Sequence, residues 1–260
     1  MYINEFRSLT PVKESPYGIL SAAVNVKNID EIDVEGKALK TGLVSSYVAD
    51  WSKIDDFDNA TKVYVSPVKQ EDVEENLITF QVVLESAVST VLLGRDYEYL
   101  NSVVERMTKP ALQKSIESQV WAIIAAKNPT SVSASQVSSR RGVALLESKY
   151  AAESNGERGV IHAPREHSLG LRPMSDNDVL YDDIGTPIVA GSGYPTASGN
   201  IYMTGPMTVY VSKPLVLQEV KDDSASLRKN TAILRVGYSV GVSFIGKPFA
   251  AWCDTALDFK

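Results

Sequence analysis

The segment Ala232–Phe244 constrains the fold most, because its side chains alternate between two kinds. Apolar residues occupy positions 232, 234, 236, 238, 240, 242 and 244. From position 235 onward, arginine, glycine and serine fill the positions between them. A period of two is typical of a β-strand, whose successive side chains point to opposite faces of a sheet. We therefore predict one long strand, apolar on one face and small on the other.

A second long element is predicted over Leu100–Ala126. Apolar side chains recur there at steps of three and four residues, which places them on one face of an α-helix. The charged residues fall largely between them: Arg106, Lys109, Lys114, Glu117 and Lys127. Pro110 lacks an amide donor, so we expect a kink or a break near residue 109. Asn128-Pro129 should end the helix.

Shorter elements complete the predicted fold class, which is α+β. The stretch 77–84 predicts a strand from its β-branched and aromatic content. A second helix is expected from about 135 to 155, with Gly156 as its stop. Its inward residues should be Val137, Val143, Ala144, Leu145 and Leu146. Short strands are expected at 159–163, 186–190 and 201–211. Residues 1–23 suggest an extended arm, and 24–75 a long, poorly packed excursion.

Composition narrows the class of protein. The chain has 260 residues with 44% hydrophobic and 22% charged, which is ordinary for a soluble globular protein. The single cysteine, Cys253, excludes an internal disulfide and fits a reducing compartment. No apolar run approaches the length of a membrane helix, and we expect neither export nor membrane association.

Charge is concentrated in one segment. The net charge is −6, whereas residues 30–75 alone carry 12 acids and 5 lysines, a net −7. A nucleic-acid-binding protein of this size would normally show a basic face instead. The acidic segment is either a solvated surface or an arm that meets basic groups on another protein.

One motif suggests a serine hydrolase. Gly237-Tyr238-Ser239-Val240-Gly241 matches the G-x-S-x-G nucleophile elbow. That elbow needs a strand-to-helix turn and a histidine that follows the serine, but here the match lies inside the alternating strand. The only histidines, His162 and His167, both precede it. We therefore expect no enzyme activity, and keep hydrolysis by Ser239 as an alternative.

Other candidate sites are weaker still. Pro164 separates His162 from His167, so a helical zinc motif is excluded, and Glu166 alone does not complete a metal site. The run 191–195, Gly-Ser-Gly-Tyr-Pro, lacks the features of a phosphate-binding loop and predicts a turn. Cys253 is expected to be a small buried residue. Each of the three tryptophans is expected to be a packing anchor, separate from the other two. No metal or cofactor is expected.

Five phrases of the sequence are informative when they are taken together. They are PYGILSAA at 16–23, LLE at 145–147, GVIHAPR at 159–165, TPIVAGSGY at 186–194 and IYMTGPMTV at 201–209. Together they resemble the short major capsid proteins of tailed bacteriophages that infect actinobacteria. The first is similar to that family's opening, the second and third to its "LE…G-x-IH-x-PR" stretch, and the last two to its next two segments, in the same order. The resemblance covers roughly residues 16–23 and 77–255.

This resemblance implies the Hong Kong 97-like capsid fold. It would make 1–23 an N-terminal arm and 24–75 an extended β-hairpin loop. Residues 76–127 would form a peripheral domain with a long spine helix, 128–212 an axial domain, and 213–260 the return strands of the peripheral domain. Some relatives form a Lys–Asn cross-link, but Lys37, Lys40 and Asn230 have no distinguishing context here. The chain starts with the arm, so no fused scaffolding domain is expected.

The resemblance also implies a function. The chain would be a structural major capsid protein that assembles with itself into pentamers and hexamers of an icosahedral phage head around double-stranded DNA, without sequence-specific binding. Portal and scaffolding or decoration proteins would be further partners. The protein would be located in the virion after assembly in the bacterial host cytoplasm. An encapsulin-like compartment shell is an alternative with the same fold.

Within the predicted loop, four acidic residues are candidates for contacts between subunits: Asp30, Glu31, Asp33 and Glu35. Each would meet a basic side chain of a neighbour. Exposed ion pairs of this kind contribute only about 0–1 kcal/mol each. They become effective because assembly repeats them around every ring.

Overall fold

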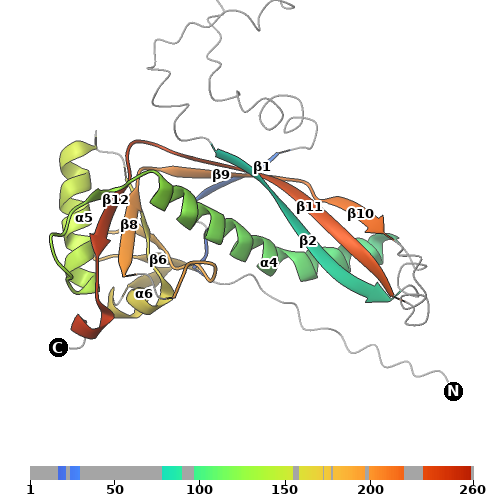
Figure 1. Ribbon diagram of the computed structural model, residues 1–260, viewed down its shortest axis with the longest axis horizontal. Helices are drawn as coiled ribbons and strands as arrows, with labels where there is room; N and C mark the ends of the chain where they lie inside the picture. The colour runs from blue at the N-terminus through green and yellow to red at the C-terminus, as the bar shows by residue number, and fades with distance from the viewer. Residues whose placement is uncertain are drawn as a thin grey trace, which may run out of the picture.

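The computed structural model describes residues 17–21, 24–29, 78–89, 97–154, 158–171, 173–176, 178–196, 199–219 and 231–258. Within these residues the chain has three α-helices and two β-sheets, so the predicted α+β class is confirmed. The seven-stranded sheet lies at one end, and a long strand pair reaches toward the other (Figure 1). The acidic residues Asp30, Glu31, Asp33 and Glu35 lie outside the described residues.

The first sheet is built around the longest strand, β11 (Thr231–Phe244). One edge of β11 pairs antiparallel with β2 (Ile78–Ser89) over twelve residue pairs, from Thr231–Ser89 to Val242–Ile78. β11 also pairs with β10 (Leu215–Glu219) and β9 (Met207–Ser212). Strand β1 (Asn25–Ile29) joins β9 in parallel. The long alternating strand is therefore confirmed.

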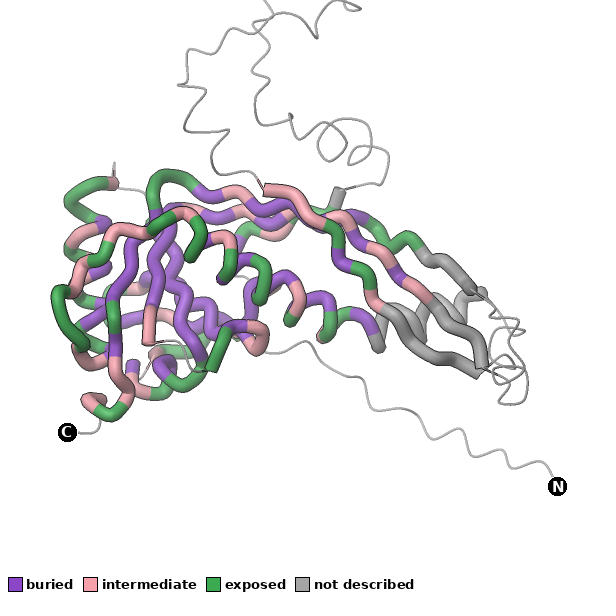
Figure 2. The backbone as a smooth tube through the Cα atoms, viewed as in Figure 1, coloured by how far each residue is buried: buried purple, intermediate pink, exposed green. Residues whose placement is uncertain are grey.

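The alternation in β11 has the predicted effect on burial. Five of its apolar residues are at most 6% exposed: Val236, Tyr238, Val240, Val242 and Phe244. They face the helix α4 (Tyr97–Ala126) and share one core cluster with it. Figure 2 shows buried positions alternating with partly buried ones along much of β11.

Helix α4 is 30 residues long, about 45 Å at the usual rise of 1.5 Å per residue. Its core-facing residues recur at the predicted four-residue steps: Leu112, Ile116, Val120 and Ile124. The helix continues through Pro110, so the alternative of a break near residue 109 is wrong. The prediction that Glu117 lies on the polar side is also wrong, because Glu117 is 0% exposed.

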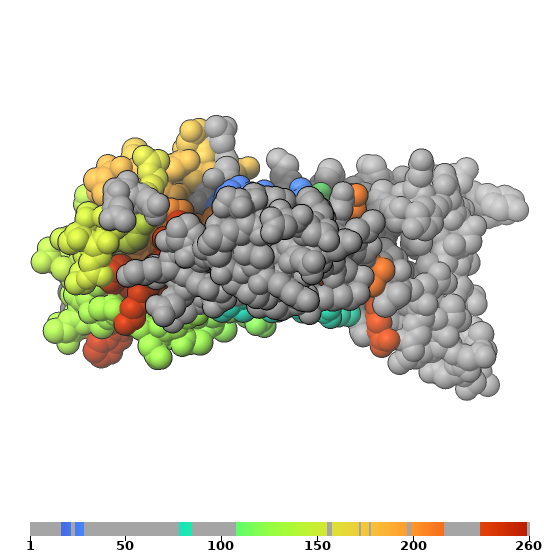
Figure 3. Space-filling view, turned by 90° about the horizontal axis from the view of Figure 1, so that it is seen from above, coloured from blue at the N-terminus to red at the C-terminus, as the bar shows by residue number. Residues whose placement is uncertain are grey.

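The second sheet has seven short strands in the order β3-β12-β8-β4-β7-β6-β5. Their bounds are Thr130–Ser131 (β3), Phe249–Trp252 (β12), Asn200–Thr204 (β8), Val160–His162 (β4), Pro187–Val189 (β7), Val179–Tyr181 (β6) and Met174–Asp176 (β5). Three further elements accompany this sheet: α5 (Ser139–Glu153), α6 (Arg165–Leu171) and the 3-10 helix η5 (Thr255–Leu257). Figure 3 shows this group gathered at one end.

Along the sequence, strands of the two sheets alternate more often than the predicted domain boundaries imply. The expected strand 201–211 is two strands, β8 and β9, which belong to different sheets and are separated by Gly205-Pro206. Strand β12 pairs with β8, although 213–260 was expected to return beside the long helix. Residues 24–29, expected to begin a loop, carry strand β1 and the buried Val24.

The second helix begins later than predicted, at Ser139, because the Ser138 side chain caps it by accepting from the Arg141 amide. Val143 and Leu146 are buried as expected, but Ala144 is exposed. Gly156 lies outside the described residues. No helix in the described part of the chain is long and apolar enough to cross a membrane.

Candidate functional site at the junction of the two sheets

The buried carboxylate of Glu117 on helix α4 accepts hydrogen bonds from four donors. Its Oε1 accepts from the Ile19 amide at 3.1 Å and from Nε2 of Gln113 at 2.9 Å. Its Oε2 accepts from the Gly193 amide at 2.7 Å and from Oγ of Ser192 at 3.3 Å. A buried carboxylate is costly unless it is fully hydrogen-bonded, and these four donors supply that compensation.

Three of these donors come from two segments that are far from α4 in the sequence. The segment Tyr17–Ser21 supplies the Ile19 amide, and Ile19 itself is 0% exposed. The same segment is fixed to the seven-stranded sheet, since the Tyr17 amide donates to the Asp178 carbonyl at 3.2 Å and the Ala190 amide donates to the Tyr17 carbonyl at 2.8 Å. The turn at 191–194 supplies the other pair. Glu117 therefore ties three separate segments together.

Three glycines allow this close approach. A Cβ on Gly18 would lie 1.4 Å from Nε2 of Gln113, and one on Gly191 would lie 2.6 Å from Cδ of Glu117. A Cβ on Gly193 would lie 2.1 Å from the backbone oxygen of Lys114. Real Cβ atoms do not approach other atoms so closely, so both segments can contact the helix only because glycine has no side chain.

A second buried network continues from the same turn. Oη of Tyr194 lies 2.7 Å from Nδ1 of His162, and Nε2 of His162 lies 3.1 Å from Oγ1 of Thr204. Thr204 donates its own hydroxyl proton to the Gly205 carbonyl at 3.0 Å. This series of hydrogen bonds assigns the proton of neutral His162 to Nε2, so the Tyr194 hydroxyl donates to Nδ1.

Burial controls the ionisation of both rings. It lowers the pKa of His162 to about 3, so the imidazole is neutral at ordinary pH. Burial and the nearby charge of Glu117 raise the pKa of Tyr194 well above its usual range. Trp121 of α4 packs on two tyrosine rings, with centroids 4.8 Å from Tyr194 and 4.6 Å from Tyr202.

This junction is suited to holding parts of the chain together and not to turning over a substrate. Glu117 and His162 are both 0% exposed, and Tyr194 is only 4% exposed. Each has its polar atoms hydrogen-bonded to other parts of the chain. We conclude that the junction fixes the position of the N-terminal segment and of the seven-stranded sheet relative to helix α4.

A second cluster combines serine, histidine and aspartate. Oγ of Ser139 donates to Oδ2 of Asp258 at 2.5 Å, and Nδ1 of His167 lies 2.8 Å from the same Oγ. A catalytic triad places the histidine between serine and aspartate, whereas here the serine lies in the middle and is 0% exposed. The Ser139 amide also donates to Asp258 at 2.6 Å, so the cluster anchors the C-terminal segment to the start of α5.

The structure does not bring the candidate residues of the sequence together. Ser239 lies inside β11, opposite Gln81 of β2, so no strand-to-helix elbow exists there. His162 and His167 belong to the two separate clusters described above. Across the described residues, no group of three or more histidine, cysteine or acidic side chains could hold a metal.

The single cysteine and the two described tryptophans differ in how far they are buried. Cys253 is 1% exposed, as predicted, and burial together with the charge of Asp258 raises its pKa to about 12. Trp121 is buried as a packing anchor, but Trp252 is 48% exposed, so that prediction is wrong for Trp252. Trp51 lies outside the described residues.

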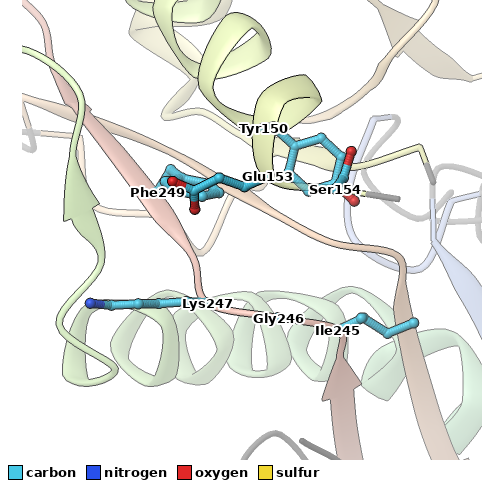
Figure 4. Close-up of a pocket in the computed structure, with 7 residues that line it drawn as sticks. All are labelled: Tyr150, Glu153, Ser154, Ile245, Gly246, Lys247 and Phe249. Atoms are coloured by element: carbon cyan, nitrogen blue, oxygen red, sulfur yellow. The ribbon is translucent and has the colours of Figure 1, made fainter. Parts of the chain in front are cut away.

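A shallow cavity of about 160 Å³ lies where the end of α5 meets the connection between β11 and β12. Figure 4 shows the aromatic rings of Tyr150 and Phe249 on one side and the chain from Ile245 to Lys247 on the other. The rim carries Glu153 and Lys247. This cavity is separate from the residues of the Glu117 junction.

No protein-family model matches the chain, and no curated protein matches it. Several solved structures are similar to part or most of this chain. A chain of Microbacterium phage Oxtober96 is 11% identical, with 98% of this chain and 96% of that chain covered at a TM-score of 0.49. A chain of the capsid of an empty GTA particle is 10% identical, with 68% and 72% covered and a TM-score of 0.48.

A chain of the holo-SrpI encapsulin complex from Synechococcus elongatus is 11% identical, with 67% of this chain and 73% of that chain covered at a TM-score of 0.46. At such low identities these similarities assign no activity or partner to this chain. Further similar chains come from Mycobacterium and Gordonia phages.

Proposed function

We propose that this chain is the structural subunit of a closed protein shell, a phage major capsid protein that assembles with itself into pentamers and hexamers around double-stranded DNA. The observation that carries the proposal is the arrangement of the described residues. A 30-residue helix runs beside a twelve-residue strand pair, and a separate seven-stranded sheet lies at the other end. This arrangement supports the division into spine-helix and axial regions that the sequence resemblance implies.

The junction around Glu117 supports the same proposal. A shell subunit must keep one shape while its contacts differ slightly between rings of five and six. Glu117 links α4, the N-terminal segment and the 191–194 turn through buried hydrogen bonds. Such fully satisfied buried networks make a core rigid and specific. A core of this kind would fix the curvature of the shell, while segments outside it adapt.

Exposed apolar side chains support contacts on more than one side. Large apolar residues are at least 48% exposed at seven described positions: Val83, Leu169, Met174, Ile184, Leu215, Ile245 and Trp252. They are distributed over both sheets, α6, the β6–β7 turn and the β11–β12 connection. A subunit of a closed shell touches several neighbours, and burying these side chains at such contacts would stabilise the assembly.

In this proposal the regions keep the roles expected from the sequence. Residues 1–23, of which 17–21 pack against α4, act as the N-terminal arm. The part of 24–75 that follows strand β1 acts as the extended loop, with Asp30, Glu31, Asp33 and Glu35 meeting basic groups of a neighbouring subunit. Portal and scaffolding or decoration proteins are further partners, and assembly takes place in the bacterial host cytoplasm. The chain itself is not an enzyme, and Ser239 has a structural role within β11.

Sedimentation of the purified full-length chain, followed by analysis of its contents, tests the proposal. We expect particles of megadalton mass, and particles recovered from infected cells should protect DNA from nuclease. An encapsulin-like shell would instead contain an enzyme cargo and no protected DNA. A chain that stays monomeric under all assembly conditions would contradict both shell functions. An esterase activity abolished by Ser239→Ala would favour the hydrolase alternative.

A further inference from the structure

The two opposite edges of the seven-stranded sheet differ in charge. At one edge, residues 174–186 form β5, β6 and the following turn, and they contain four aspartates and no basic residue. The other edge consists of β12 and the segment 127–137, which contains β3 and runs beside β12. Residues 127–137 and 245–252 contain two lysines and no acidic residue. We call these the acidic edge and the basic edge.

On the acidic edge, two of the four aspartates are turned to the outside. Asp182 is buried and accepts from two amides of its own turn. Asp183 forms an ion pair with Arg140 of α5 at 2.7 Å. Asp176 and Asp178 are exposed, and they give this edge its negative charge.

On the basic edge, the two lysines lie close to the starts of the strands. Lys247 is exposed just before β12, and Lys127 is partly exposed just before β3. Because β12 and β3 pair in parallel, both lysines lie at the same end of this edge. Glu153 lies on the rim of the nearby cavity, but it forms an ion pair with Lys149. This edge therefore keeps its positive charge.

Both edges also expose large apolar side chains. Met174 and Ile184 are 57% and 70% exposed at the acidic edge, and Ile245 and Trp252 are 54% and 48% exposed at the basic edge. The strands between the edges, β8, β4 and β7, carry none of the large exposed apolar residues found in the described part of the chain. Figure 4 shows the cavity beside Lys247, which offers an incoming apolar side chain aromatic rings to pack against. Apolar side chains beside charged ones are typical of a surface that contacts another protein.

The opposite charges of the edges indicate what covers them. Two acidic edges or two basic edges would repel each other, so a contact between like edges is disfavoured, whereas unlike edges attract. We propose that the acidic edge of one copy of this chain packs against the basic edge of the next copy, and that this head-to-tail contact closes the rings of the shell. A repeated head-to-tail contact forms a ring when its rotation closes. This inference rests on the proposed shell function and assigns two surfaces to it.

Charge reversal in the full-length chain tests the contact. Asp176→Lys and Lys247→Glu each place like charges across it, so each should raise the protein concentration needed for assembly by about 5- to 20-fold at low salt. The double variant restores opposite charges and should assemble within about threefold of wild type. Lys114→Glu, on the exposed side of α4 and outside both edges, is the matched control and should assemble like wild type. Sedimentation measures assembly, and circular dichroism checks that each variant is folded.

Cysteine cross-linking tests the same contact without a change of charge sign. The native Cys253 is 1% exposed, so a maleimide reagent should react with introduced cysteines instead. In particles treated with a bismaleimide, Asp176→Cys combined with Lys247→Cys in one chain should give covalent oligomers of up to five or six subunits. Each single-cysteine variant should stay uncross-linked, because like edges do not meet.

The outcomes separate this contact from the shell function. The contact is disproved if both charge-reversal variants assemble like Lys114→Glu, if the double variant assembles no better than the single ones, or if single-cysteine particles yield cross-linked dimers. Wild-type particles would still form in each of these cases, so the shell function would stand. Wild-type protein that never assembles would contradict the shell function and, with it, this contact.

Discussion

Replacing Glu117 by glutamine keeps the size of the side chain but exchanges one carboxylate oxygen for an amide NH₂ group. Each oxygen of Glu117 now accepts from two donors, and the four donor–acceptor distances are 2.7, 2.9, 3.1 and 3.3 Å. In Glu117→Gln one pair of donors would face another donor. Either the Ile19 amide or the Gly193 amide would lose its acceptor inside the core.

The magnitude follows from these contacts. A hydrogen bond to a charged group is worth about 1.5–3 kcal/mol, and a buried donor left without an acceptor costs about 1–3 kcal/mol. The neutral amide is less costly to bury than the carboxylate, which offsets part of the loss. We expect Glu117→Gln to lower the free energy of unfolding by about 2–4 kcal/mol, a large part of the about 5–15 kcal/mol typical of a domain.

Urea unfolding followed by circular dichroism measures this change, and amide hydrogen exchange locates it at Ile19 and Gly193. Two control variants define the scale. Ser192→Ala removes the longest of the four bonds and should cost about 0.5–1.5 kcal/mol. Glu153→Gln, at an exposed site, should change stability by less than about 0.5 kcal/mol. A Glu117→Gln variant as stable as Glu153→Gln would refute the reasoning.

Three further changes give distinct outcomes. Ile116→Asp puts a charge at a 0% exposed position and should lower the free energy of unfolding by at least about 4 kcal/mol. Lys114→Asp, on the exposed side of α4, should leave the free energy of unfolding nearly unchanged. Equal stability of the two variants would show that the buried face of α4 is assigned wrongly. Gly193→Ala forces a Cβ to within 2.1 Å of a backbone oxygen and should cost about 1–3 kcal/mol by urea unfolding. Deleting 33–42 should preserve the circular dichroism spectrum but prevent shell formation, and normal shells would show that this segment makes no essential contact.

The sequence predicted the elements whose periodicity is long and uninterrupted. The alternation of β11 and the four-residue steps of α4 each extend over more than ten residues, so local patterns determined them. The expected single strand at 201–211 failed at Gly205-Pro206. Periodicity there does not show that two strands enter different sheets, because that depends on pairing partners distant in the chain.

The junction around Glu117 was not predicted, because its signal is divided among three segments. On a helix with one buried face, Gln113 and Glu117 would lie at the edge of the polar side. In this fold α4 is also covered by Tyr17–Ser21 and by the 191–194 turn, which widens its buried face. Gly18, Gly191 and Gly193 were the available signal, and both glycine phrases belong to the segments that carry the family resemblance.

Electron microscopy of the purified full-length protein tests the central claim most directly. A shell-forming subunit should yield closed polyhedral particles of uniform size, whose reconstruction resolves rings of five and six subunits with α4 in every one. The same preparation of Glu117→Gln should give fewer or irregular particles. Only monomers or small open oligomers, at concentrations and salt conditions that span those of assembly, would contradict the account.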